Sequence, residues 1–417
     1  METKFLLGAS TAAYQVEGNN KYSDFWIMEH LEHTSFAEKS GDAVDHYHRY
    51  EEDIKLMKKA GMNAFRFSIE WSRIESEKGV YVKEEIEHYR NVLKCCHENG
   101  IIPVVTMHHF SSPQWLIQEG GWESEQVVEY FKNYCIYVVE QLGDLMEYVC
   151  TINEANMRLQ MASVMRTMAQ NMGINLQVGV KLELPEEIMV GQREACAAFG
   201  GVEAVNTFQT PCTEQGDLLI MKAHEAARDA MKAVCPDLKV GLTLSLHDIQ
   251  PVEGGEAYAE ENWKEEFTHY LPYIEKDDFF GLQNYTRSIV DANGELPVPE
   301  GKPRTQMGYE YYPESLEHVI RAVAKDLHIP ILITENGVAA SDDRERVAFI
   351  ETVSEGVKAC MQDEIPVIGY LHWSLMDNFE WQLGFSKTFG LIEVDRTTME
   401  RKPKESFYKM AEIWEEK

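Results

Sequence analysis

The chain has 417 residues, a length that fits two or three domains or one large α/β barrel with insertions. Its 44% hydrophobic residues can form a large core, and 39 Lys and Arg against 70 Asp and Glu give a net charge of −31. Phosphate binding needs a basic face, and the sequence has no basic run, so nucleic acids and anionic membrane surfaces are disfavoured as partners. No apolar segment reaches the roughly 18 residues that a membrane span requires.

The N-terminus and the cysteines bear on location. The stretch "KFLLGASTAA" has the Lys, the apolar run and the small residues of a secretion signal, but the run is short and the polar group "YQVEG" follows at once. We therefore predict a first strand that stays on the mature protein. The eight cysteines form no C-x-x-C pair, and several have apolar neighbours, as buried free thiols do. These features favour a reducing compartment, and we expect a cytoplasmic protein.

One pattern recurs along the chain: a helical stretch, a short break and a compact apolar strand. The predicted strands are, in order, "FLLGAS", "NAFRFSI", "IIPVVTM", "EYVCTIN", "LKVGLTLSL", "DDFFGLQNY", "PILITEN" and "PVIGYLHW". The predicted helices cover residues 47–61, 83–99, 124–142, 216–234, 261–271, 313–327, 343–361 and 403–415. The strands are continuously apolar, as expected where helices cover one face of a sheet and a packed interior covers the other.

Eight strands that alternate with helices predict an α/β fold, a (β/α)8 TIM barrel in a single domain over residues 1–417. The alternative is a doubly wound open sheet, which normally carries a Gly-rich phosphate loop after the first strand. The segment "GASTAAYQVEG" lacks the G-x-G-x-x-G spacing of that loop. Residues 155–215 fit no barrel unit, and we expect an elaborated loop region over one barrel rim there, partly helical around 156–172.

Polar and aromatic residues gather where the predicted strands end, which is where barrel enzymes place their chemistry. In chain order they are Gln15 with Glu17 nearby, Arg66, His108 and His109, Asn153 and Glu154, Asn284 and Tyr285, Glu335 and Asn336, His372 and Trp373, and Glu380 and Trp381. Taken singly, each has a structural explanation, such as a helix cap, a rim ion pair or a core side chain. Together they are typical of a sugar site, where aromatic faces stack on a pyranose and amides and carboxylates bind its hydroxyls.

The histidines raise a second possibility, a metal site. The candidates are "DHYH" at 45–48 and the pair His108-His109. No H-E-x-x-H or similar helical spacing accompanies them, so we expect no metal.

Longer motifs give the chain a resemblance to glycoside hydrolase family 1, the β-glucosidase family. They are "FLLGASTAAYQVEG", "DHYHRYEEDI", "FRFSIEWSRI", "TMHHFSSPQWL", "GGW", "TINEAN", "LITENG", "LHWSLMDNFEWQLGF", "GLIEVD" and "RKPKESFYKM". They extend over nearly the whole chain and form a highly specific set. The resemblance implies a small-molecule β-glycoside as substrate and no cofactor.

The resemblance also implies a role for each candidate residue. Glu154 would be the general acid/base and Glu335 the nucleophile of a double displacement that retains the β configuration, with their carboxyl groups about 5–5.5 Å apart. Arg66 and Tyr285 would keep Glu335 ionised, and the charge of Glu335 would help to keep Glu154 protonated. The remaining implied contacts are Asn153 on the 2-hydroxyl of the sugar, Gln15, His109, Glu380 and Trp381 on the 3-, 4- and 6-hydroxyls, and Trp373 as the stacking floor.

The implied function is that of a retaining, exo-acting β-glycosidase. A β-glucosidase is the first expectation, and β-galactosides and β-fucosides are further candidate substrates. The alternatives are a non-catalytic carbohydrate-binding barrel, a transglycosidase that uses the same residues, and a 6-phospho-β-glycosidase. The carboxylate of Glu380 suits a free hydroxymethyl group and would repel a phosphate, and Glu154 disfavours the plant thioglucosidases, which lack this acid.

The sequence departs from the family pattern at several positions. The departures are Ala155 in place of Pro after the acid, Gln283 in place of Asn before the Tyr, His108 and Phe110 in place of Tyr and Trp around His109, and Thr388 in place of Arg. The change to Ala155 leaves the backbone beyond the acid less constrained. Residues 155–215 resemble the family poorly, and this region overhangs the leaving-group side in relatives, so the resemblance implies least about leaving-group preference.

Overall fold

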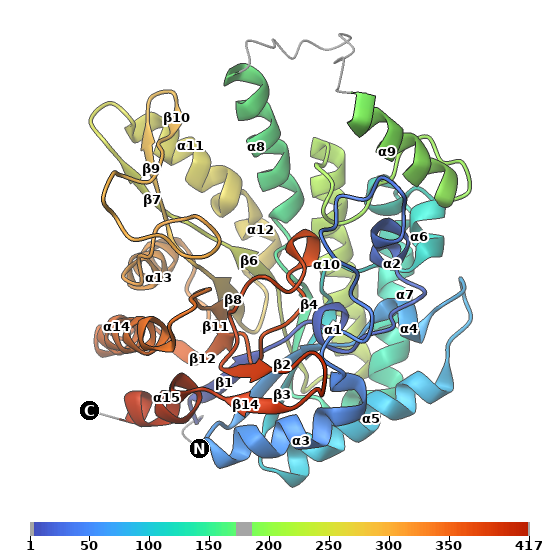
Figure 1. Cartoon of the computed structure of the whole chain (residues 1–417), viewed down its shortest axis with the longest axis horizontal. Coiled ribbons are helices and arrows are strands. Elements are labelled where there is room, and N and C mark those ends of the chain that lie inside the picture. Colours follow the sequence, from blue (N-terminus) through green and yellow to red (C-terminus); the bar gives the residue numbers. More distant parts are fainter. Residues whose placement is uncertain (1–3, 172–185, 416–417) are drawn as a thin grey trace.

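The computed structural model describes residues 4–171 and 186–415, and its centre is a parallel β-barrel surrounded by helices (Figure 1). The barrel strands are β1 Leu6–Ser10, β2 Ala64–Ser68, β3 Ile102–His108, β4 Tyr148–Ile152, β5 Lys239–Gly241, β6 Thr243–Ser245, β8 Phe280–Gln283, β11 Ile331–Asn336 and β12 Val367–Trp373. They join in the order β5-β4-β3-β2-β1-β12-β11-β8-β6, so each strand lies beside its neighbours in the chain and the last closes onto the first.

The fifth predicted strand is divided between β5 and β6. β5 pairs with β4, and β6 pairs with β8, so the chain changes neighbours at Leu242. The Leu242 N–H donates to Asp277 Oδ2 at 3.0 Å instead of to a strand. Gly241 allows close packing at this point, because a Cβ there would lie 2.2 Å from the Phe279 carbonyl oxygen. With β5 and β6 counted as one strand, the sheet has eight strands in chain order, which confirms the predicted (β/α)8 barrel.

The long helices cover the outside of the barrel. Those at predicted positions are α3 His46–Lys59, α5 Lys83–Glu98, α7 Val127–Leu142, α10 Glu214–Val234, α13 Ser315–Asp326, α14 Asp343–Gln362 and α15 Glu405–Glu415. The shorter ones are α1 Ala13–Val16, α2 Asp24–Glu29, α4 Trp71–Ile74, α6 Gln114–Gln118, η1 Gly121–Glu123, η2 Gly143–Leu145 and η4 Trp381–Leu383. Within the described part of the chain, no helix combines the length and the apolar character needed to cross a membrane.

The weak helix predicted over 261–271 is misplaced. α11 covers Glu256–Glu266, and η3 Thr268–Tyr270 and α12 Leu271–Ile274 follow it. The break falls at Phe267, whose backbone leaves the helical region (φ −137°, ψ −61°). The Phe267 side chain is fully buried. The helix therefore ends where a ring packs into the core, a contact that local helix propensity does not predict.

Two small sheets were not predicted. One comprises β7 Asp248–Pro251, β9 Arg287–Asp291 and β10 Gly294–Glu295, and the other comprises β13 Ile392–Val394 and β14 Arg401–Pro403. None of these strands exceeds five residues, so none gives a periodic signal that stands out from a loop.

The segment 155–215 contains two helices as far as it is described. α8, Met157–Asn171, confirms the helix expected near residue 156, and α9, Glu186–Ala198, was not predicted; residues 172–185 lie outside the described residues. Figure 1 shows α8 and α9 at the top of the view, beyond the barrel. The Glu194 carboxylate ties α9 to the loop after α2, because it accepts from the backbone N–H groups of Glu32 at 2.6 Å and His33 at 2.9 Å.

The barrel has a small core of its own, separate from the larger one between strands and helices. Its buried members are Leu6, Ala64, Val104, Tyr148, Cys150, Phe279, Leu332 and Leu371. Alternate residues of a strand face the same side, so Arg66, two residues after Ala64, also points inward, one layer nearer the C-terminal ends of the strands. All eight cysteines are free and five of them are buried, as predicted.

Candidate active site

The C-terminal ends of the barrel strands lie level with one another, which brings residues from distant parts of the chain together. Ser10 is the register partner of both Arg66 and Trp373, and Glu335 is the partner of Gln283. Above this level lies a cavity of about 280 Å³. Its lining residues are His109, Phe110, Asn153, Glu154, Met157, Gln160, Gln209, Ser245, His247, Tyr285, Thr286, Met307, Tyr309, Glu335, Trp373, Glu380, Trp381 and Phe389.

Eight of the ten predicted site residues line this cavity, and the other two donate hydrogen bonds to lining residues. The eight are His109, Asn153, Glu154, Tyr285, Glu335, Trp373, Glu380 and Trp381. Gln15 and Arg66 donate hydrogen bonds to Glu380 and Glu335, respectively. Glu17 turns away, and its carboxylate pairs with Arg73 at 2.8 Å.

Glu335 is the more strongly held of the two predicted carboxylates. Arg66 Nη1 donates to its Oε1 at 2.5 Å, and the Tyr285 hydroxyl donates to its Oε2 at 2.6 Å. His109 Nε2 lies 3.9 Å from Oε1. Burial raises the pKa of Glu335, and the charge of Arg66 and the hydrogen bond from Tyr285 oppose that rise. Both partners therefore favour the ionised carboxylate.

Glu154 has the opposite environment. Within residues 4–171 and 186–415, its carboxyl group has no hydrogen bond or ion pair, although its side chain is buried. Burial raises the pKa of Glu154 well above its ordinary value, and the negative charge of Glu335 raises it further. The cavity therefore holds one carboxyl group surrounded by donors and one that favours its proton.

The backbone at Glu154 is strained and is held by the fifth strand. Its φ of 44° is in the left-handed region that non-glycine residues rarely adopt. The Glu154 N–H donates to Thr243 Oγ1 at 2.9 Å, and the N–H of Ala155 donates to the Thr243 carbonyl at 3.0 Å. Phe110 and Trp381, which also line the cavity, have positive φ as well. Strained backbone of this kind gathers at functional sites, where the surrounding structure enforces it.

Asn153 presents its amide N–H groups to the cavity. Its Oδ1 accepts from Arg66 Nη2 at 2.5 Å and from Gln283 Nε2 at 2.7 Å, whereas its buried Nδ2 has no partner within the described residues. Gln283, a departure from the family pattern, thus helps to fix the amide of Asn153. A buried donor without a partner costs free energy, so a hydrogen bond from this donor to an acceptor oxygen of a ligand would favour binding.

Gln15 and Glu380 form a second polar pair. Gln15 Nε2 donates to the Phe379 carbonyl at 2.8 Å and to Glu380 Oε2 at 3.3 Å, and its buried Oε1 has no partner within the described residues. Burial raises the pKa of Glu380 to about 7, and the charge of Glu335 adds to the rise. These groups offer one acceptor and one carboxyl group to a ligand.

Aromatic rings form the wall beside His109. Its ring stacks on Trp373 with 5.7 Å between centroids and on Trp381 with 6.2 Å. Phe110 packs against Trp381 at 5.3 Å. An apolar wall next to unpartnered donors and acceptors is the combination that binds a sugar ring.

Ten lining residues were missed from the sequence. They are Phe110, Met157, Gln160, Gln209, Ser245, His247, Thr286, Met307, Tyr309 and Phe389. The strand-end rule would have found His247, because it directly follows the predicted strand "LKVGLTLSL". Gln209, Met307 and Tyr309 lie on loops far from any strand end, and no sequence signal marks them.

The histidines of the metal hypothesis have other partners. His108 Nε2 is 3.0 Å from Ser112 Oγ, and His46 Nδ1 is 2.7 Å from Asp53 Oδ2. Among the residues that the structure describes, no three His, Cys, Asp or Glu side chains are arranged to hold a metal ion.

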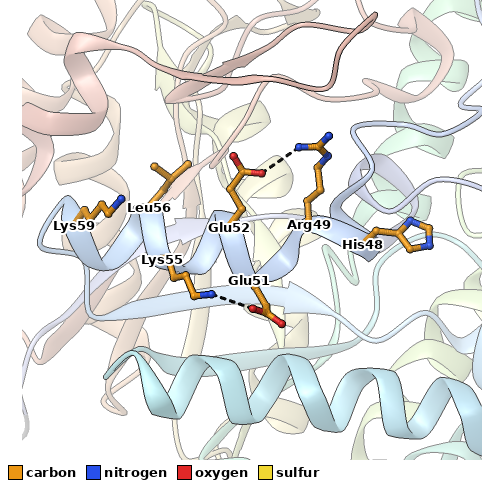
Figure 2. Close-up of a pocket in the computed structure, with 7 residues that line it drawn as sticks. All are labelled: His48, Arg49, Glu51, Glu52, Lys55, Leu56 and Lys59. Carbon is orange, nitrogen blue, oxygen red and sulfur yellow. Dashed lines mark hydrogen bonds and ion pairs between the residues drawn. The ribbon is translucent and has the colours of Figure 1, made fainter.

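A second hollow, of about 490 Å³, lies over α3 and is shown in Figure 2. Figure 2 shows two ion pairs along the helix, Arg49 with Glu52 and Lys55 with Glu51. None of the seven lining residues is buried, so water screens their charges and they would bind a ligand only weakly. The cavity at the strand ends is therefore the candidate active site.

The whole chain matches one family of known proteins. Glycosyl hydrolase family 1 matches residues 1–297 and 266–417. Beta-glucosidase A of Acetivibrio thermocellus is 30% identical over 98% of this chain and 97% of its own length. A bifunctional beta-D-glucosidase/beta-D-fucosidase of Bifidobacterium breve is 28% identical over 97% of this chain and 95% of its own. The crystal structure of beta-glycosidase BGL167 has a TM-score of 0.90 at 44% identity, covering 99% of this chain and 97% of that one.

Three observations point to the same family. They are the (β/α)8 barrel, the cavity with two carboxyl groups at the C-terminal ends of its strands, and the match over the whole chain. The chain belongs to glycosyl hydrolase family 1 and is an O-glycosyl hydrolase.

Proposed function

We propose that the protein is a retaining, exo-acting β-glycosidase that removes a terminal β-glucosyl residue. The observation that carries this proposal is the pair of buried carboxyl groups on one cavity with opposite surroundings. Glu335 is bonded by Arg66 and Tyr285, and Glu154 is left without a partner within the described residues. A nucleophile that stays ionised and an acid that keeps its proton are the two groups that double displacement needs.

In the first step, the Glu335 carboxylate attacks the anomeric carbon while Glu154 gives its proton to the glycosidic oxygen. The bond from this carbon to the glycosidic oxygen breaks, and the leaving group departs as an alcohol. In the second step, Glu154, now a carboxylate, takes a proton from water, which attacks the same carbon and releases Glu335. Two inversions give net retention of the β configuration.

The other groups would bind the sugar. The free Nδ2 of Asn153 is placed to donate to the 2-hydroxyl, a contact that strengthens in the transition state. Gln15, His109, Glu380 and Trp381 would bind the 3-, 4- and 6-hydroxyls, and Trp373 would form the stacking floor. The beta-glucosidase and beta-fucosidase names of relatives support β-glucosides first and β-fucosides as a further substrate, with β-galactosides as a third candidate. The eight free cysteines support a cytoplasmic location.

A panel of 4-nitrophenyl glycosides tests the proposal. We expect release of nitrophenol from the β-glucoside and none from the α-glucoside, with the β anomer of glucose as the first product seen by NMR. The 6-phospho-β-glucoside should be a poor substrate above pH 7, because Glu380, whose pKa burial raises to about 7, is ionised there and its charge would face the phosphate. An α anomer as first product, or no cleavage of any β-glycoside by a folded sample, would contradict the proposal.

Tyr285→Phe is expected to move the acidic limb of the pH profile. The Tyr285 hydroxyl donates to Glu335 at 2.6 Å and holds down the pKa of that carboxyl group. Loss of this hydrogen bond removes one of the interactions that hold the Glu335 pKa down, so that pKa rises. The ionised nucleophile is then lost at higher pH, so the acidic limb of kcat/KM shifts upward while the basic limb stays in place. An unchanged acidic limb would show that Tyr285 does not act on Glu335.

A further inference from the structure

His247 is held in the cavity wall by one carboxylate. It follows β6, and its ring lines the same cavity as Glu154. Its Nδ1 lies 2.8 Å from Glu266 Oε1, and its backbone N–H donates to Glu266 Oε2 at 2.9 Å. The Glu266 side chain is only 7% exposed, so both of its oxygens are fixed on one residue. This clamp determines where the other ring nitrogen lies.

The second ring nitrogen, Nε2, is free for a ligand. No hydrogen bond to it occurs within residues 4–171 and 186–415, and the side chain is 36% exposed. The negative charge of Glu266, with smaller contributions from Glu295 and Glu154, raises the pKa of His247 to about 9. Below that pH both ring nitrogens carry protons, so Nε2 is a charged hydrogen-bond donor.

The position of His247 is beside the proposed acid rather than beside the nucleophile. Asn156, two residues after Glu154, donates from Nδ2 to the Ser245 carbonyl at 2.7 Å and accepts from the Ser245 N–H at 3.1 Å, and Ser245 lies two residues before His247. Glu335, by contrast, is bordered by Tyr285 and His109, whose rings pack against Phe389 and the two lining tryptophans. The acid gives its proton to the leaving group, so the wall next to Glu154 is where the leaving group lies.

Beside Met157, this wall carries polar groups. Gln160, one turn into α8, donates from Nε2 to the Ser245 carbonyl at 2.9 Å, and both residues line the cavity with His247. An aryl leaving group would gain most from a flat aromatic surface, whereas a sugar gains from donors and acceptors. The wall beside Glu154 offers the second kind of contact.

We propose that His247, clamped by Glu266, donates a hydrogen bond from Nε2 to a sugar in the leaving-group position, so that the natural substrates are β-linked di- or oligosaccharides. This inference rests on the proposed function, because it assumes that Glu154 is the acid. His247 is a specificity-determining residue in this account.

The test compares substrates that share the glucosyl group and differ in the leaving group. The probes are cellobiose, laminaribiose, gentiobiose and 4-nitrophenyl β-glucoside. In His247→Ala, kcat/KM for the best disaccharide should fall about 10- to 100-fold, the loss expected for a hydrogen bond to a charged donor. The fall for the nitrophenyl glucoside should be less than about 3-fold, because that leaving group makes no such bond. His247→Gln keeps a neutral donor and should recover part of the disaccharide rate.

His318→Ala is the matched control. His318 also pairs with a carboxylate, with Nδ1 at 2.7 Å from Asp248 Oδ2, but it does not line the cavity. The His318→Ala variant should leave the rates on all four substrates unchanged, and thermal unfolding should show that each variant is folded. Equal losses on disaccharides and aryl glucoside, or no loss on disaccharides, would overturn the role of His247. If wild type cleaves the aryl glucoside but none of the disaccharides, the inference fails and the proposed function stands; if it cleaves neither, the proposed function fails.

Discussion

Glu335→Ala is expected to lower turnover of 4-nitrophenyl β-glucoside by about 10⁵-fold or more, the scale of loss when a covalent nucleophile is removed. We expect neither of the other two cavity carboxyl groups to replace it, because burial still raises the pKa of Glu154 in this variant and Glu380 accepts a hydrogen bond from Gln15. Nitrophenol release under single-turnover conditions measures the loss. Incubation of wild type with an activated 2-deoxy-2-fluoro-β-glucoside should release its leaving group and add one 2-deoxy-2-fluoroglucosyl unit to the peptide that contains Glu335.

The stereochemistry of rescue gives a sharper result than the loss alone. The space left by the Glu335 side chain can admit azide, which would attack an activated glucoside from the face that the nucleophile used. One inversion then gives the α-glucosyl azide. A β-glucosyl azide from this variant would mean that Glu335 is not the nucleophile.

Glu70→Gln is the control for loss of a buried carboxyl group. Glu70 is also buried, with its pKa raised by burial to about 7, and its Oε1 accepts from Ser72 and Ser111. Gln keeps an acceptor oxygen there. We expect this variant to keep its activity. A loss of activity in Glu335→Ala would then be due to the position of Glu335 in the cavity and not to the removal of a buried carboxyl group as such.

Much of the barrel could be predicted because its strands are buried on both faces. Continuous apolar runs such as those of β3 and β11, each preceded by a helix, are typical of strands that are covered on both faces. The break at Leu242 could not be predicted. It depends on the approach of Phe279 to Gly241 and on the hydrogen bond from Leu242 to Asp277, and both partners are more than 30 residues away.

The site was predictable for the same reason as the barrel. Glu154 and Glu335 lie 181 positions apart in the numbering, yet Glu154 follows β4 and Glu335 lies at the end of β11. The C-terminal ends of parallel strands in one barrel meet at one rim. Gln209 and Tyr309 reach the cavity from long loops, whose paths are set by tertiary contacts such as the hydrogen bond from Gln382 to Gln209 at 2.8 Å. Local sequence does not encode contacts of that kind.

Glu154→Ala should have an effect that depends on the leaving group. A disaccharide needs protonation of its departing oxygen, so its kcat/KM should fall by about 10²- to 10⁴-fold, the usual contribution of a general acid. A 2,4-dinitrophenyl glucoside leaves without a proton, so its kcat/KM should stay near that of wild type. Its kcat should fall, because water attacks the glucosyl-enzyme without a base, and its KM should fall with it as that intermediate accumulates. Burst kinetics with this substrate would show the accumulation directly.

Azide separates the role of Glu154 from a loss of structure. It is already an anion and needs no base, and removal of a side chain that has no hydrogen-bond partner within the described residues leaves room for it beside the glucosyl-enzyme. We expect azide to raise kcat for the dinitrophenyl glucoside in Glu154→Ala and to give the β-glucosyl azide, because it attacks from the face opposite Glu335. The same azide should have no effect on wild type, where the charge of Glu154 repels it. An α-glucosyl azide, or a uniform loss on all substrates without rescue, would place the acid elsewhere. The pair of azide products, α from one variant and β from the other, would thus assign the two carboxyl groups to opposite faces of the same sugar.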